Sequence, residues 1–220
     1  LSGFVYVANK NAWLRATNAA PLDYQQHPSH WVKITPTATA YTSRTSRSTI
    51  KTGQLEPIDR AVPRMVAFAG RMFVARNTTV GPQLWSCNPA LGGTLTQCDP
   101  NEWALVAPNS VGDTLLTQFD DPTLTSVTML VATATHLYVG FDGSAGLQVF
   151  RTTNTAATSR ADFQGTGGCS AALHPASCQG HGGTGFGDPS LKRIFDAQAP
   201  SFGTSVWVTA GSGAAPLRLV

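Results

Sequence analysis

The sequence has few charged residues and no segment typical of a long helix or a membrane span. Asp, Glu, Lys and Arg make up 12% of its 220 residues, about half the roughly 25% of an average globular chain. The net charge of +3 is too small to predict binding to nucleic acid or to an anionic membrane. No apolar run approaches the roughly 20 residues that a spanning helix needs, and no interval shows a sustained apolar stripe at helical spacing. We therefore expect an all-β protein without a membrane span or a nucleic-acid partner.

Residues for common catalytic chemistry are also scarce. The two glutamates, Glu56 and Glu102, fall in expected loops, and no two acids have a spacing that suggests general acid and base work. The glycine-rich run 180–183 follows no expected strand and opens no helix, so it does not predict a phosphate site. The sequence predicts no catalytic residue and no cofactor, and it favours a binding protein over an enzyme.

The cysteines are few and fall into two short pairs. The four are Cys87, Cys98, Cys169 and Cys178. Of three pairings we expect the local one, Cys87 with Cys98 and Cys169 with Cys178, because each pair brackets a short, turn-rich segment. Disulfides predict an extracellular, cell-surface or periplasmic protein. Zinc bound by Cys169, His174, Cys178 and His181 is the alternative, but the run lacks the tight Cys-x2-Cys spacing of most structural zinc sites, so no metal site is predicted.

The segment 136–153 is present in its clearest form as two apolar runs joined by a glycine-rich turn. Both runs contain β-branched and aromatic residues, which is typical of a β-hairpin. Gly143 and Gly146 are expected to take the positive φ angles that such a reversal needs. This hairpin is the unit on which the rest of the chain is aligned.

The first run of the hairpin recurs three more times. Its aromatic residue aligns as Tyr6, Phe73, Tyr138 and Trp207, with separations of 67, 65 and 69 residues. Companion runs recur at matching offsets, and together they predict four strands per repeat. In chain order, the expected first strands are 65–68, 129–132 and 194–197; the second strands are 5–8, 72–75, 137–140 and 206–209; the third are 12–15, 83–86, 148–151 and 216–219; the fourth are 31–34, 103–106 and, more weakly, a strand near Phe163.

Repeated four-stranded sheets predict a β-propeller, because stacking sheets around an axis covers both apolar faces of each sheet. A sandwich of two sheets is the alternative. The chain would cover about three and a half blades of ~67 residues, either as part of a larger propeller, which we favour, or as a small ring with incomplete blades. The expected units are 1–36, 64–108, 128–168 and 193–220, and the expected long loops are 37–63, 109–127 and 169–192.

In an up-and-down sheet, the long loops share one edge with the turns between second and third strands, so this edge is the expected functional face. The first long loop is rich in Ser and Thr and carries basic residues. Tyr41, Arg44, Arg47 and Lys51 are the candidate ligand-binding residues, because such a cluster suits an anionic glycan, a phosphate or an acidic protein. A solvated loop without a ligand is the simpler interpretation.

Several other residues have both a structural and a functional interpretation. Arg15 and Arg151 share a position in the third strands, and structural arginines are expected there. His27 and His30 could place two imidazoles together in a turn. Asp142 is expected to support a turn rather than to bind calcium. Asn77 begins a glycosylation sequon.

Two runs of this repeat resemble the blades of bacterial secreted propellers of the sialidase-like, Asp-box type. They are 137–140 with 146–153, and Gly185–Pro189 before the last expected first strand. The family's turn reads Ser-x-Asp-x-Gly-x-Thr-Trp. Here 152–158 follows it with substitutions at three positions, and Phe163 stands for the displaced Trp. In that family this turn is structural, so the resemblance implies a fold and a bacterial, secreted origin but assigns no catalytic residue.

Taken together, these observations predict a secreted or cell-surface adhesion module that recognises a glycan or a protein through long loops on one face. Two alternatives stay open. One is a fragment of a sialidase-like glycoside hydrolase, and the other is a structural subunit of a larger surface assembly. The open edges of the sheets are expected to be covered by the remainder of a propeller or by a partner chain.

If blades of a larger propeller are absent from these 220 residues, the intact mass of the native polypeptide will lie well above 23.1 kDa. Mass spectrometry of the protein isolated from its source measures this directly. A native mass of about 23.1 kDa would contradict the expectation of further blades.

Overall fold

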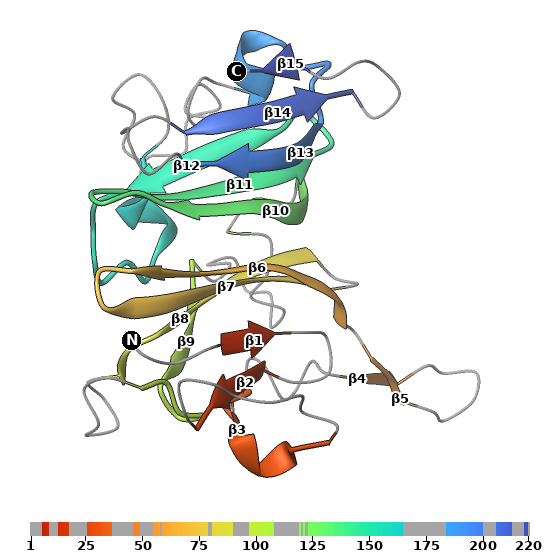
Figure 1. Cartoon of the computed structure of the whole chain (residues 1–220). Coiled ribbons are helices and arrows are strands. Elements are labelled where there is room, and N and C mark those ends of the chain that lie inside the picture. Colours follow the sequence, from red (N-terminus) through yellow and green to blue (C-terminus); the bar gives the residue numbers. More distant parts are fainter. Residues whose placement is uncertain are drawn as a thin grey trace.

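The fold is built from antiparallel sheets that follow one another along the chain, as the computed structural model in Figure 1 shows. The all-β prediction is therefore confirmed. Helical structure among the described residues is limited to short 3-10 turns, including η1 (Pro28–His30), η4 (Arg160–Asp162) and η7 (Thr184–Gly187). The structure describes residues 6–8, 13–17, 26–36, 46–48, 55–57, 59–78, 81–89, 97–107, 119, 121, 123–164, 184–199, 206–212 and 218–219.

Four of the sheets correspond to the four repeats. Sheet I contains β1 (Tyr6–Ala8), β2 (Trp13–Ala16) and β3 (Trp31–Lys33). Sheet II contains β6 (Asp59–Phe68), β7 (Arg71–Thr78), β8 (Gly81–Cys87) and β9 (Trp103–Val106). Sheet III contains β10 (Leu124–Ala132), β11 (Leu137–Gly143) and β12 (Gln148–Thr152), and sheet IV contains β13 (Arg193–Gln198), β14 (Trp207–Gly211) and β15 (Arg218–Leu219). Each sheet is open, with its strands in chain order.

The aligned aromatic residue occupies the same register position in the first three sheets. Tyr6 pairs with Arg15, Phe73 with Ser86, and Tyr138 with Arg151, which are the matching residues of the sequence alignment. Sheet IV departs from this register by two residues, because Leu219 pairs with Thr209 rather than with Trp207. The fourth strand expected near Phe163 is reduced to a single bridge between Gln164 and Arg151.

Two of the segments expected as long loops contain strands. Within 37–63, β4 (Ser46–Ser48) pairs with β5 (Leu55–Pro57), and β6 already begins at Asp59. Within 109–127, β10 begins at Leu124. Pro63 concealed the early start of β6, because proline removes a ladder hydrogen bond. It is tolerated here because it lies at a register shift between Ala61 and Arg64, where the regular ladder is interrupted.

Apolar side chains form a separate core between each pair of successive sheets. Trp13 of sheet I packs with Trp85 and Trp103 of sheet II. A second core joins sheets II and III, and a third joins sheets III and IV. Sheets II and III are therefore buried on both faces, which explains why β7 and β11 read as almost continuously apolar. The two-sheet sandwich is not the observed arrangement, because these cores lie between four successive sheets.

The hairpin on which the repeats were aligned is present, and the turn between β11 and β12 spans residues 144–147. Gly146 has the expected positive φ, of 132°. Gly143 does not, so that part of the prediction was wrong. Gly143 is required for a different reason: a Cβ atom there would collide with the backbone oxygen of Gly146.

A polar side chain near the end of the second strand attaches each central sheet to the next one. Asn77 of sheet II donates from Nδ2 to the Val127 carbonyl oxygen at 2.9 Å and accepts the Val127 N–H at 2.7 Å. Asp142 of sheet III accepts the Ile194 N–H of sheet IV at 2.9 Å. Asn77 and Asp142 are 65 residues apart, the same separation as Phe73 and Tyr138. We call these two contacts the sheet clamps.

The first strands of sheets II, III and IV converge at one side. Arg64 of β6 lies 3.4 Å from Asp196 of β13, measured from Nη2 to Oδ1. Sheets stacked in parallel are about 10 Å apart, so β6 and β13 would be separated by about 20 Å if sheet III simply lay between them. The Arg64–Asp196 contact requires the three sheets to fan out from their first strands.

Loss of a sheet clamp will destabilise the protein. We expect Asn77→Ala to lower the free energy of unfolding by about 2 kcal/mol, because the buried Val127 backbone loses both a donor and an acceptor. Chemical denaturation monitored by circular dichroism measures this. Thr153→Ala, at an exposed position, is the control and should change stability by less than about 0.5 kcal/mol. Equal stability of the two variants would contradict the role given to Asn77.

Candidate functional site

The candidate ligand residues of the first long loop fall mostly outside the described residues. Tyr41, Arg44 and Lys51 all do. Arg47 lies in β4, where the register places Glu56 of β5 directly opposite. The basic character expected for this segment is therefore accompanied by an acidic residue at the one position that the structure describes.

The β11–β12 turn lies against the two segments that lead into the first strands of sheets III and IV. The Ser144 N–H donates to the carbonyl oxygen of Thr123, just before β10, at 2.9 Å. The Leu147 N–H donates to the carbonyl oxygen of Leu191, just before β13, at 2.8 Å. These contacts place the turn and both connections at one edge of the sheets, as their up-and-down order predicts. We call the region formed by Asp121, Thr123, 144–148 and 185–192 the loop edge.

The carboxylate of Asp121 at the loop edge is engaged by neighbouring donors. One oxygen accepts the Thr123 N–H at 2.8 Å and its hydroxyl at 2.7 Å. The other accepts Nε2 of the buried Gln148 at 3.2 Å. With both oxygens occupied, Asp121 is suited to holding the shape of the loop edge rather than to proton transfer.

The exposed groups of the loop edge are hydroxyls and an ammonium. Lys192 donates from Nζ to the Ser144 carbonyl oxygen at 2.7 Å, and Ser144 and Ser190 are exposed beside it. Ser190 is oriented by Asp188, which accepts its hydroxyl at 2.6 Å. Such groups can hydrogen-bond to a hydroxyl-rich or anionic ligand, because an ammonium has three donors and a hydroxyl can donate or accept.

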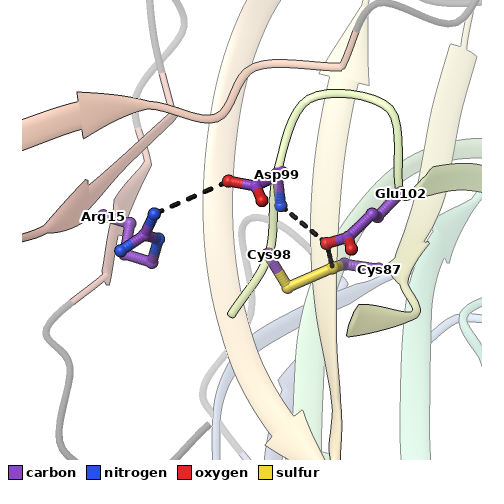
Figure 2. Close-up of a disulfide and its surroundings, with 5 residues drawn as sticks. All are labelled: Arg15, Cys87, Cys98, Asp99 and Glu102. Carbon is purple, nitrogen blue, oxygen red and sulfur yellow. Dashed lines mark hydrogen bonds and ion pairs between the residues drawn. A yellow bond between two sulfur atoms is a disulfide. The ribbon is translucent and has the colours of Figure 1, made fainter. Parts of the chain in front are cut away.

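The predicted Cys87–Cys98 disulfide is present and lies where sheet II meets sheet I (Figure 2). Both cysteines are fully buried, and their Cα atoms are 6.0 Å apart. The buried Glu102 accepts the Asp99 N–H at 2.7 Å, and the same carboxylate oxygen lies 3.8 Å from Cys87 Sγ. The disulfide and Glu102 thus fix the segment around Asp99. The second predicted disulfide, Cys169–Cys178, lies outside the described residues.

Arg15 of sheet I reaches this segment. Its Nη2 lies 3.5 Å from Asp99 Oδ1, and its side chain is almost entirely buried while that of Asp99 is partly exposed. Tyr6 is close to the same groups. Burial raises its pKa above 10.0, although the backbone of Cys98 and the charge of Arg15 act in the opposite direction. The structural role expected for Arg15 is therefore present, as a contact between two sheets.

The turn that resembles an Asp box is stabilised by its own side chains. Asn154 accepts the Ala156 N–H at 2.9 Å and donates to Asp162 at 2.7 Å. Burial opposes ionisation of Asp162, but hydrogen bonds from Thr158, Ser159 and Asn154 outweigh it and lower its pKa. Phe163, which stands for the displaced Trp, is fully buried. This turn is structural and lies at the end of β12, away from the β11–β12 turn.

The other candidate residues have structural contacts. His27 and His30 stack with ring centroids 5.2 Å apart. Asp142 lies in β11 and forms a sheet clamp, and Asn77, the first residue of the sequon, forms the other. Among the described residues, no group of three or more His, Cys, Asp or Glu side chains could hold a metal ion. In the same part of the chain, no helix is long and apolar enough to cross a membrane.

Sequence reasoning missed the residues that shape the loop edge and attach the sheets. A signal for some of them was present. Asn77 and Asp142 are separated by 65 residues, and so are Gln83 and Gln148, which matches the repeat. Extending the alignment beyond apolar positions would have found these polar pairs.

Ionisation of Tyr6 will destabilise the folded protein at alkaline pH. Because burial raises its folded pKa, the contribution of Tyr6 to stability is complete below pH 10.0 and is lost as pH rises through the folded pKa. We expect the stability difference between wild type and Tyr6→Phe to be constant below about pH 10 and then to shift in favour of the variant. Urea denaturation at a series of pH values measures this, and a difference that stays constant at alkaline pH would contradict the assignment.

Comparison with known proteins gives no family for this chain. No protein-family model, no curated protein and no solved structure matches it. Its functional interpretation therefore depends on its own residues and their geometry.

Proposed function

We propose that this chain is a secreted, propeller-type binding module that recognises a glycan or protein partner at the loop edge. The observation that carries the proposal is the convergence of the β11–β12 turn with both neighbouring connections, through the Ser144–Thr123 and Leu147–Leu191 hydrogen bonds. A rigid set of sheets then presents several loops on one side, an arrangement frequently used for binding.

The propeller arrangement is supported by the repeated contacts between sheets. The sheet clamps attach sheet II to sheet III and sheet III to sheet IV through residues at the same position of the repeat. The Arg64–Asp196 contact brings together the first strands of sheets II and IV. A radial arrangement around an axis accounts for both features, because each sheet is then related to the next by a similar rotation.

Binding is a better match to the loop edge than catalysis. Asp121 and Asp188 both accept hydrogen bonds from neighbouring groups, whereas Ser144, Ser190 and Lys192 are exposed. A glycan bearing an acidic group offers acceptors for the ammonium and for the hydroxyls. The buried Cys87–Cys98 disulfide supports an oxidising, extracellular location.

The proposal predicts that ligand binding depends on Lys192. On a glycan array, and in pull-down from extracellular material of the source, we expect Lys192→Ala to weaken binding about tenfold, the effect of losing one charged hydrogen bond. Arg71→Ala is the matched control, because Arg71 follows the Ala69–Gly70 turn at the opposite edge of sheet II.

Three results would contradict the proposal. The first is no binding to any glycan or extracellular protein. The second is weaker binding of Arg71→Ala than of Lys192→Ala. The third is release of sugar from a fluorogenic glycoside, which would assign the chain to the hydrolase alternative instead.

A further inference from the structure

Sheet IV exposes two large aromatic side chains on the face that points away from sheet III. Ile194, Val208 and Ala210 are buried in the core shared with sheet III. Trp207 precedes Val208 in β14 and is 49% exposed, and Phe195, displaced at a bulge in β13, is 47% exposed. We call the surface formed by Phe195 and Trp207 the free face.

The same position of the repeat is covered in every preceding sheet. Tyr6 packs into the core between sheets I and II, Phe73 is fully buried between sheets II and III, and Tyr138 packs into the core between sheets III and IV. Each of these aromatics contacts the sheet that follows it in the chain. Trp207 occupies the equivalent position in the alignment and is the exposed member of the set.

Exposed large apolar side chains are otherwise rare in this protein. Among the described residues, the only others at least 36% exposed are represented by Val32 of β3. Two of three such side chains thus lie on one face of one sheet. Such a concentration marks an interaction surface more often than scattered single residues do.

We propose that the free face is a self-association surface, which packs against the free face of a second copy of this chain. A two-fold contact of this kind covers Phe195 and Trp207 of both copies at once, because each copy contributes the same patch. The charges on β13 do not oppose it, since the strand carries both Arg193 and Asp196.

The clamp position distinguishes a second copy from a further sheet added like the others. Asn77 and Asp142 lie four residues after the aligned aromatic in sheets II and III, and the equivalent residue of sheet IV is Gly211. Glycine has no side chain to bond the backbone of a following sheet, so the hydrogen bonds that attach sheets III and IV to their predecessors are not available here. Apolar face-to-face packing does not need them.

Sedimentation velocity over a wide range of protein concentration tests this inference. We expect wild type to form a dimer reversibly, and Trp207→Ser and Phe195→Ser each to weaken it by at least about tenfold, as truncation of a central interface residue does. Val32→Ser is the matched control and should associate like wild type, because β3 belongs to sheet I. Thermal unfolding and circular dichroism verify that each variant is folded, and Phe195→Ser carries the test if Trp207→Ser does not fold.

A wild type that stays monomeric at every concentration would overturn the proposal, and would instead fit a free face that another sheet of the repeat covers. A dimer that is unaffected by both aromatic substitutions, or equally weakened by Val32→Ser, would also overturn it. Non-reducing electrophoresis completes the test, because a dimer linked by a disulfide would not be the proposed one.

Discussion

The structure depends on apolar packing between successive sheets. A single three- or four-stranded sheet has two faces, and in sheets II and III both faces carry large apolar side chains such as Phe73, Trp85 and Phe141. Burying one such side chain contributes about 1.5–3 kcal/mol relative to leaving it in water. Each central sheet is therefore stable only between two neighbours, and the fold extends as a series of sheets rather than closing as one pair.

Polar contacts determine how the sheets are oriented. Apolar packing alone is non-directional, whereas the hydrogen bonds of Asn77 and Asp142 join defined side-chain atoms to a defined backbone position in the next sheet. The disulfide, Glu102 and Asp99 perform a related task for sheet I, where Arg15 provides the contact. The same orientation brings the β11–β12 turn against its neighbouring connections, so the loop edge is a consequence of how the sheets meet.

Much of the strand order could be predicted from the sequence, because the repeat is written in large residues. Aromatic and β-branched runs located most strands of the four sheets, and the spacing of Cys87 and Cys98 predicted their disulfide. The loop edge was predicted only as a location. Its contacts involve backbone atoms of Thr123 and Leu191 and the side chain of Lys192, which lie far apart in the chain and have no periodic signature. Strand β6 was predicted too short because the bulge that accommodates Pro63 depends on its pairing with β7.

Amide hydrogen exchange at Val127 and Ile194, followed by NMR, tests most directly whether successive sheets are attached by one repeated contact. The account predicts slow exchange at both amides in wild type, faster exchange at Val127 alone in Asn77→Ala, and faster exchange at Ile194 alone in Asp142→Ala. Rapid exchange at either amide in wild type, or simultaneous loss of protection at both amides in each variant, would contradict it.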